Sequence, residues 1–134
     1  MKKRLTLWMV LLALWTALFA YLTIQNGAET ELTGSTIARW IARVFGGDTA
    51  KVHLILRKAA HIISFFVEAL LLAQVFRVAG MKRAALWSIS ICLLLSVGAE
   101  AVKLGIEGRH FAWVDVGLNV VGSIVGGGVC SRKG

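Results

Sequence analysis

The sequence predicts an all-α fold, an integral membrane four-helix bundle with a short interfacial amphipathic helix in its first outer loop. Of the 134 residues, 57% are hydrophobic, none is proline, and the mean hydropathy is +0.75. Four apolar runs each approach the roughly 20 residues that an α-helix needs to cross a bilayer. Since nothing in the composition marks a domain boundary, residues 1–134 are expected to form a single transmembrane domain.

Basic residues are distributed unevenly between the ends of these runs. Eight of the 15 Lys and Arg lie at residues 2–4, 77–83 and 132–133, where no acidic residue occurs. The remaining seven share their segments with all seven acidic residues. Lys and Arg in short loops mark the cytoplasmic side of a membrane. We therefore expect a multi-pass protein of the cell inner or plasma membrane, with both termini and the 77–83 turn on the cytoplasmic side. The net charge of +8 then reflects topology, and no nucleic-acid partner is expected, because that would require a solvent-facing basic surface.

The first span is expected at residues 7–24. Trp8 and Tyr21 lie near its ends, as aromatic residues do at membrane interfaces. The span contains no Lys, Arg, His, Asp or Glu. A charged start followed by an apolar run also resembles a secretory signal. Because no convincing small-residue cleavage site precedes Gln25, an uncleaved anchor is the preferred interpretation.

A short amphipathic helix is expected within the outer loop 25–53. Its polar face would carry Arg39 and Arg43, with Thr33 or Ser35 capping its start and two glycines ending it. The apolar face follows helical spacing: Ile37, Trp40, Ile41, Val44 and Phe45. We interpret this segment as a helix lying in the outer interface, and a lid over a site below it is the alternative.

The second span, at about 54–76, carries ionisable residues at helical spacing. Arg57, His61, Ser64 and Glu68 project within a sector of about 60° when each residue advances about 100°. Ionisable groups in membrane spans nearly always face the bundle interior or a watery cavity. This stripe is therefore predicted to face inward, with Glu68 protonated or paired.

The third and fourth spans, at about 84–104 and 113–130, each carry a comparable stripe. The third has Glu100 and Lys103, and the fourth has Asp115 and Asn119, while Arg109 lies in the 105–112 loop between the spans. The fourth stripe continues with glycines four residues apart, a spacing that lets helix backbones approach closely, so an oligomer through the Gly122/Gly126 face is one expectation. Two further side chains, Cys92 and Cys130, have no disulfide or metal spacing and are expected to pack in the interior.

These residues resemble the VanZ-like family of small bacterial membrane proteins. The family usually shows an Arg-Lys pair, a His and an aromatic residue in one span, then a Glu, a Gly-Arg pair, an Asp, an Asn four residues later and following glycines. The matching positions are Arg57, Lys58, His61, Phe65, Glu100, Gly108, Arg109, Asp115, Asn119, Gly122 and Gly126. Four positions depart from the usual pattern: Lys103 replaces a Gln, Ala99 replaces an Asp, Glu107 replaces a Pro, and Ser64 replaces a carboxylate.

The resemblance covers about residues 50–130 and implies a membrane protein of the bacterial cell envelope. One member of the family confers low-level resistance to teicoplanin, so the resemblance implies a contribution to antibiotic resistance of that type. It assigns no molecular activity. Phosphate transfer to butyryl groups is not expected, because nothing in the chain resembles a nucleotide or coenzyme A site.

If the three stripes face inward, they enclose a polar funnel open to the outside. Its predicted ligand-binding residues are Arg57, Lys58, His61, Ser64, Glu100, Lys103, Arg109, Asp115 and Asn119. Arginine grips phosphate or carboxylate with two parallel hydrogen bonds. The predicted partner is therefore a membrane lipid, a lipid-linked envelope precursor or the lipid tail of a lipoglycopeptide. No cofactor is expected, and no metal, because no paired ligand spacing such as HxxxH occurs.

Three alternatives remain open at this stage. The polar groups could simply join the helices, since interhelical hydrogen bonds contribute about 0.6–2 kcal/mol each. The site could belong to an intramembrane enzyme with His61 or Glu100 as general base, although no nucleophile motif accompanies them and no catalytic residue is assigned. The chain could also be a purely structural or assembly subunit. A non-enzymatic binding module is the preferred hypothesis.

Overall fold

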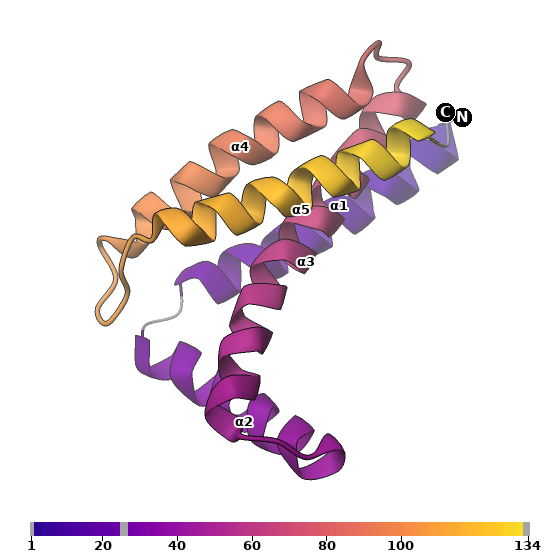
Figure 1. Ribbon diagram of the computed structural model, residues 1–134. Coiled ribbons are helices and arrows are strands. Elements are labelled where there is room, and N and C mark those ends of the chain that lie inside the picture. Colours follow the sequence, from indigo (N-terminus) through magenta and orange to yellow (C-terminus); the bar gives the residue numbers. More distant parts are fainter. Residues whose placement is uncertain (1, 25–26, 133–134) are drawn as a thin grey trace.

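The computed structural model describes residues 2–24 and 27–132, which form five α-helices and no strand (Figure 1). Four helices are long and apolar enough to cross a membrane: α1 (Lys2–Ile24), α3 (Thr49–Val78), α4 (Ala84–Lys103) and α5 (Trp113–Arg132). The predicted all-α class is confirmed, and so is the prediction of four helices able to span a membrane. Gln25 and Lys133, which entered the predictions above, lie outside the described residues.

The helix between the first two spans, α2 (Gly27–Phe45), is longer than predicted. The expected caps are wrong, because Ser35 lies inside the helix and its Oγ donates to Leu32 O at 3.3 Å. Gly34, which reads as a helix breaker, lies in the helix where α2 meets α3: an added Cβ would lie 2.5 Å from His53 Nε2. The C-terminal end is as predicted, since Gly46 takes a positive φ of 81° just after Phe45.

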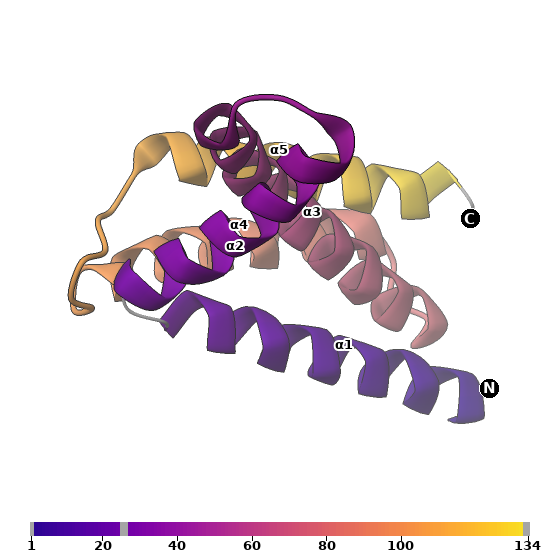
Figure 2. The same cartoon turned by 90° about the horizontal axis from the view of Figure 1, so that it is seen from below.

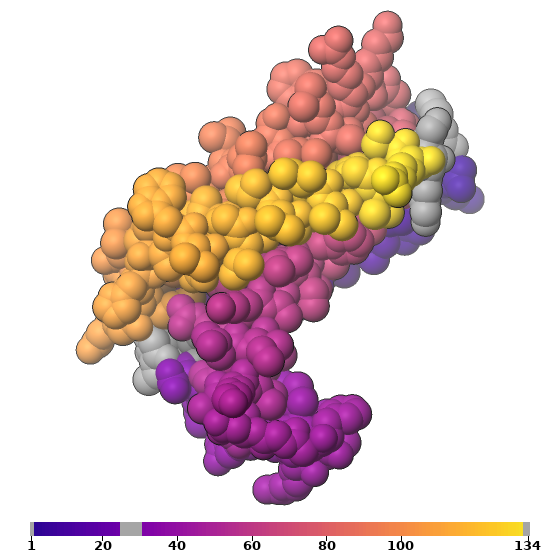
Figure 3. All heavy atoms as spheres, viewed as in Figure 1, coloured from indigo at the N-terminus to yellow at the C-terminus, as the bar shows by residue number. Residues whose placement is uncertain are grey.

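The central element is α3, which contacts each of the other four helices. It begins one turn earlier than predicted because Asp48 caps it, accepting from Ala50 N at 3.1 Å. Figure 2 shows α1 along one side of α3 and α5 along another. At its first turns α3 extends beyond α4 and α5 to meet α2, and this part projects from the body of the molecule (Figure 3).

The two ends of the bundle differ in content. The first residues of α1, the last of α5 and the α3–α4 turn lie at one end, and α2 and the 104–112 loop lie at the other (Figure 1). This grouping is the one required if the basic segments share one side of the membrane. We call the end with α2 and the 104–112 loop the outer end.

The glycine face of α5 packs against α3 within the chain. A Cβ added at Gly122 would collide with the carbonyl oxygen of Ile62, and one at Gly126 with that of Phe66. The close backbone approach expected of these glycines therefore occurs inside the bundle. An oligomer through this face, as the sequence suggested, would have to displace α3.

The interior joins α3 to α4 and α1. Phe65, Ala69 and Leu72 of α3 form the apolar core with Cys92 of α4, and both cysteines are buried and free, as predicted. Ser88 Oγ of α4 donates to Ala69 O at 2.5 Å. The contribution of α1 is slight, since none of its residues is buried.

Candidate functional site

Polar side chains from three helices meet in the outer half of the bundle. We call this group the outer polar cluster: Arg57 and His61 of α3, Ser96, Glu100 and Lys103 of α4, and Asp115 and Asn119 of α5. The three inward stripes predicted from helical spacing therefore converge. The convergence depends on the close α3–α5 packing at Gly122, one turn below Asn119.

A buried ion pair lies at the centre of the cluster. Lys103 Nζ donates to Glu100 Oε1 at 2.5 Å, and the two residues are only 3% and 1% exposed. The other oxygen of Glu100 accepts from Ala112 N at 3.3 Å. Both carboxylate oxygens of Glu100 are thus satisfied, and the second bond fixes the end of the 104–112 loop to α4.

Asp115 lies in the first turn of α5, where the helix dipole favours a negative charge. Its Oδ2 is buried and makes no hydrogen bond within the part of the chain that is described, although three nitrogens surround it. His61 Nε2 lies at 3.4 Å, and Lys103 Nζ and Arg57 Nη2 each lie at 3.8 Å. These separations suit bridging by a water molecule or by a polar group of a ligand.

Asn119 orients the histidine. Its Nδ2 donates to Ser96 Oγ at 3.0 Å, which turns its Oδ1 toward His61 Nδ1, also at 3.0 Å. An amide oxygen accepts only, so His61 donates from Nδ1 and presents Nε2 to Asp115. Asn119 of α5 therefore holds the imidazole through Nδ1, and Nε2 faces Asp115 Oδ2 of the same helix at 3.4 Å without a hydrogen bond.

Arg109 brings a second arginine to the site from the 104–112 loop. Burial lowers the pKa of its guanidinium from the ordinary value and the charge of Arg57 lowers it further, while Glu100 and Asp115 raise it. Arginine nevertheless remains protonated in proteins. With Arg57 and Lys103, three cations lie beside the carboxylates of Glu100 and Asp115, and Glu31 of α2 adds a third carboxylate to the cavity lining.

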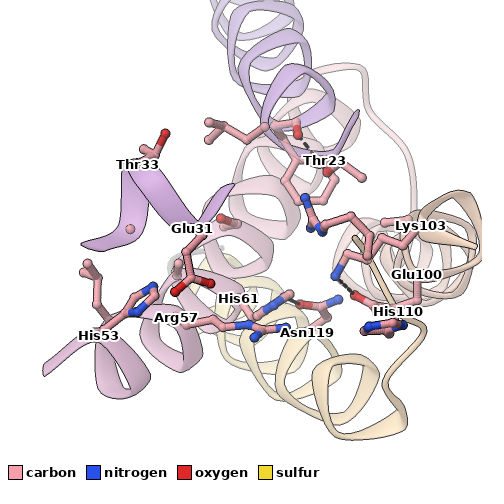
Figure 4. Close-up of a pocket in the computed structure, with 18 of the residues that line it drawn as sticks. Thr23, Glu31, Thr33, His53, Arg57, His61, Glu100, Lys103, His110 and Asn119 are labelled. Carbon is pink, nitrogen blue, oxygen red and sulfur yellow. Dashed lines mark hydrogen bonds and ion pairs between the residues drawn. The ribbon is translucent and has the colours of Figure 1, made fainter. Parts of the chain in front are cut away.

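A cavity of about 390 Å³ lies between the cluster, α1 and α2 (Figure 4). Its polar side is formed by α3, α4 and the 104–112 loop, and its other walls include Phe19 and Leu22 of α1 and Ile37 of α2. α2 therefore supplies one wall of the cavity, as a lid would, through Glu31, Thr33, Gly34 and Ile37. The volume lies within the range of about 300–1,000 Å³ that is usual for small-molecule sites.

Most of the predicted site residues face this cavity. Arg57, His61, Ser64, Glu100, Lys103, Arg109 and Asn119 line it, and Asp115 contacts Arg57, His61 and Lys103. Lys58 is the exception. It is exposed and does not line the cavity, because one residue along a helix turns the side chain by about 100° from that of Arg57.

Sequence reasoning missed three ionisable residues that line the cavity: Glu31, His53 and His110. His53 could have been found, since it lies four residues before Arg57 and eight before His61 on one helical stripe. The predicted start of the span at residue 54 excluded it. Glu31 could not, because the start of α2 was not anticipated.

Three groups in the cluster have the spacing of metal ligands. Ligand-type atoms of His61, Glu100 and Asp115 lie within 4.8 Å of one another. They come from three different helices, so no paired spacing in the sequence could reveal them. The ammonium group of Lys103 already lies against both carboxylates, and its positive charge disfavours a divalent cation between them.

Glu68 lies deeper in α3, outside the cavity. Its two carboxylate oxygens accept from Thr16 Oγ1 of α1 at 3.0 and 3.2 Å, and the residue is buried. The sequence predicted that this group would be protonated or paired. A hydroxyl of α1 is the partner.

Comparison with known proteins places the chain among relatives. The family model described as VanZ/LLP1 matches residues 6–133, which include the whole outer polar cluster. No curated protein and no solved structure matches the chain.

Proposed function

The chain belongs to the VanZ/LLP1 family, and on that premise we propose that it is a non-enzymatic binding module for the anionic headgroup of an envelope lipid or lipid-linked precursor. Bound in the outer cavity, such a lipid would be withheld from or delivered to the cell envelope. This provides a route to teicoplanin-type resistance that needs no chemical step. The lipid tail of the antibiotic itself is a further candidate ligand of the same cavity.

The observation that supports this function best is the gathering of three cations, Arg57, Lys103 and Arg109, on one side of the cavity. Lys103 is paired with Glu100, whereas Arg57 and Arg109 come from two different segments and can both reach a phosphate or carboxylate headgroup. Asp115 Oδ2 adds a buried acceptor without a hydrogen bond among the described residues, which suits a headgroup hydroxyl. A hydrogen bond to a charged group contributes about 1.5–3 kcal/mol.

We further propose that α2 lies in the outer membrane interface and that both termini are cytoplasmic. Ala38 is buried against the rest of the chain, while the apolar side chains of Trp40, Val44 and Phe45 remain exposed, as an interfacial helix requires. Single cysteines at Glu107 and Lys82, in a background without Cys92 and Cys130, test the orientation. An impermeant thiol reagent should label Glu107→Cys on intact cells and leave Lys82→Cys unlabelled, and the opposite pattern would reverse the topology.

An intramembrane enzyme acting on the same lipid is the alternative, and it would use His61 as general base. Nδ1 of His61 donates to Asn119, so Nε2 would be the base. No nucleophile motif accompanies His61 in the sequence, and the binding module therefore remains the preferred function. Incubation of the purified protein with radiolabelled lipid separates the two functions. Binding without a new product supports the module, and turnover that disappears in His61→Ala supports the enzyme.

The binding test compares phosphatidic acid with diacylglycerol of the same acyl chains, using native mass spectrometry of the protein in an uncharged detergent. We expect phosphatidic acid to bind about tenfold more tightly or better, because only it can receive the charge-assisted hydrogen bonds. Arg109→Ala should abolish the preference while the melting temperature changes little, since a loop arginine at the water boundary stabilises weakly.

Arg77→Ala is the matched control, because Arg77 lies in the last turn of α3 at the opposite end of the bundle. It should retain the preference for phosphatidic acid. Equal binding of both lipids by the wild type would exclude the proposed function, as would loss of the preference in both arginine variants. In a teicoplanin-susceptible host, any resistance given by the wild type should be lost with Arg109→Ala and kept with Arg77→Ala.

A further inference from the structure

A second hollow lies beside the outer cavity, in the seam between α1 and α3. It measures about 380 Å³ and is lined by Leu11, Leu14, Trp15 and Leu18 of α1 with Val67 and Leu71 of α3. All of these side chains are predominantly apolar. We call this hollow the α1–α3 groove.

The groove continues from the outer cavity toward the other end of the bundle. On α3, Ala60 and Ser64 line the cavity, and Val67 and Leu71 line the groove, so successive residues three or four apart form one continuous side of the helix. On α1, Leu22 lines the cavity and Leu18 follows it in the groove. The two hollows therefore follow the same pair of helices, one beyond the other.

Trp15 marks the junction. Its ring lines the groove, and its Nε1 donates to Ser64 O at 3.2 Å, while Ser64 itself lines the cavity. Along α3, the seven residues from Ser64 to Leu71 rise about 10 Å. The α1–α3 groove is thus an open apolar depression that follows the same two helices and starts where the charged cavity ends.

Helix α1 can move aside to admit a ligand. None of the residues of α1 is buried. Its contacts with the core include the Trp15 and Thr16 hydrogen bonds, an edge-to-face contact of Phe19 with Phe65 at 5.2 Å and packing of the partly buried Leu12. A ligand entering along this seam would displace lipid-facing surface and leave the α3–α4–α5 core intact.

Resting on the proposed function, we infer that the ligand of the outer cavity is a long-chain lipid and that one of its acyl chains lies in the α1–α3 groove. Charge and apolarity are arranged as such a molecule requires, with the cations at the outer end and the leucines below them. The groove then makes the affinity depend on chain length, which the charged cavity alone would not do.

The test measures binding of lysophosphatidic acid with an oleoyl or a hexanoyl chain to wild type and to Leu14→Trp, by native mass spectrometry. Leu14 is 64% exposed, so an indole there can fill the groove without entering the core. Wild type should prefer the oleoyl lipid by about tenfold or more, because apolar burial increases with each methylene. Leu14→Trp should lose most of that preference and still bind the hexanoyl lipid as wild type does.

Leu94→Trp is the matched control, since Leu94 is a lipid-facing residue of α4 that is 76% exposed and lines neither hollow. It should keep the chain-length preference. If Leu14→Trp keeps it as well, the groove only lies against bulk lipid and the inference is wrong, while the proposed function stands. If the hexanoyl lipid binds wild type no better than monohexanoyl glycerol, which lacks the phosphate, the proposed function fails and the inference fails with it.

Discussion

The two seams along α3 differ in construction. Against α5, the backbones meet at Gly122 and Gly126, and the same helix buries both Asp115 and Asn119 of the outer polar cluster. Against α1, two side-chain hydrogen bonds, an aromatic contact and the packing of Leu12 join α3 to a helix none of whose residues is buried. One face of α3 is thus fixed, and the opposite face is loosely covered.

The α3–α5 seam fixes the positions of the site residues, and the α1–α3 seam is the side on which a ligand could enter. Helix association in a membrane depends on close van der Waals packing and interhelical hydrogen bonds, and the α3–α5 seam has both. Segments with few buried contacts open at low free-energy cost, and α1 is such a segment. The cavity lies between the two kinds of wall, with its charges on the fixed side.

The largest expected effect comes from filling the fixed seam. Gly126→Leu would drive a side chain into the carbonyl of Phe66, and since overpacking costs about 1–3 kcal/mol or more, we expect little folded protein by fluorescence-detected size-exclusion chromatography. Gly117→Leu is the control, because nothing lies within 4 Å of a Cβ added there. Equal yields of the two variants would show that α5 is not held as described.

The next effect concerns the buried ion pair. Glu100→Gln removes one charge and leaves Lys103 buried with Asp115, 3.8 Å away, as its remaining charged partner. We therefore expect a loss at the lower end of the roughly 3–5 kcal/mol for breaking a buried pair, measured as the free energy of unfolding by thermal denaturation in detergent. Glu100→Gln combined with Lys103→Met removes both charges and should recover most of the stability. A double variant no more stable than the single one would contradict the pairing.

Much of the fixed seam could be predicted from the sequence. Period-3.6 spacing placed Arg57, His61 and Ser64 on one face, and it identified the glycines that allow close approach, because both patterns are local. Lys58 came from the family resemblance, and its side chain does not line the cavity because helical geometry turns it away. Spacing alone cannot say whether a helix from the same chain or from another covers the glycine face, and α3 of the same chain packs there.

The loose side was harder to predict for physical reasons. The start of α2 depends on how Gly34 fits against His53, a tertiary contact that overrides the usual low helix propensity of glycine. The α1–α3 groove has no sequence signature either, because leucines on a membrane span look alike whether they face lipid or line a hollow. The bond from Thr16 to Glu68 joins residues 52 positions apart, and only the folded chain brings them together.

A smaller effect is expected at that bond. Thr16→Val removes the hydroxyl that donates to both oxygens of Glu68, and leaving a buried polar group without its partner costs about 1–3 kcal/mol. The melting temperature should fall while α3, α4 and α5 stay assembled, as measured by trypsin resistance of the fragment that contains them. Thr6→Val is the control, because Thr6 Oγ1 donates only to Lys2 O of its own helix and is exposed. Loss of the whole assembly with Thr16→Val would mean that α1 belongs to the fixed part.

The smallest effect on stability is expected at Arg57, where it decides what the cluster is for. The guanidinium lies 3.8 Å from Asp115 Oδ2, yet its side chain is 61% exposed, so solvent screening reduces the pair to about 0–1 kcal/mol. Arg57→Ala should therefore melt within a few degrees of wild type, and its affinity for phosphatidic acid should fall about tenfold, since a charge-assisted hydrogen bond to phosphate is lost. Arg43→Ala, an exposed arginine of α2 that does not line the cavity, should change neither quantity. If the yield of folded Arg57→Ala protein instead falls in proportion to its binding of phosphatidic acid, Arg57 serves to join the helices. The cavity between α1 and the α3–α5 seam would then not be a binding site.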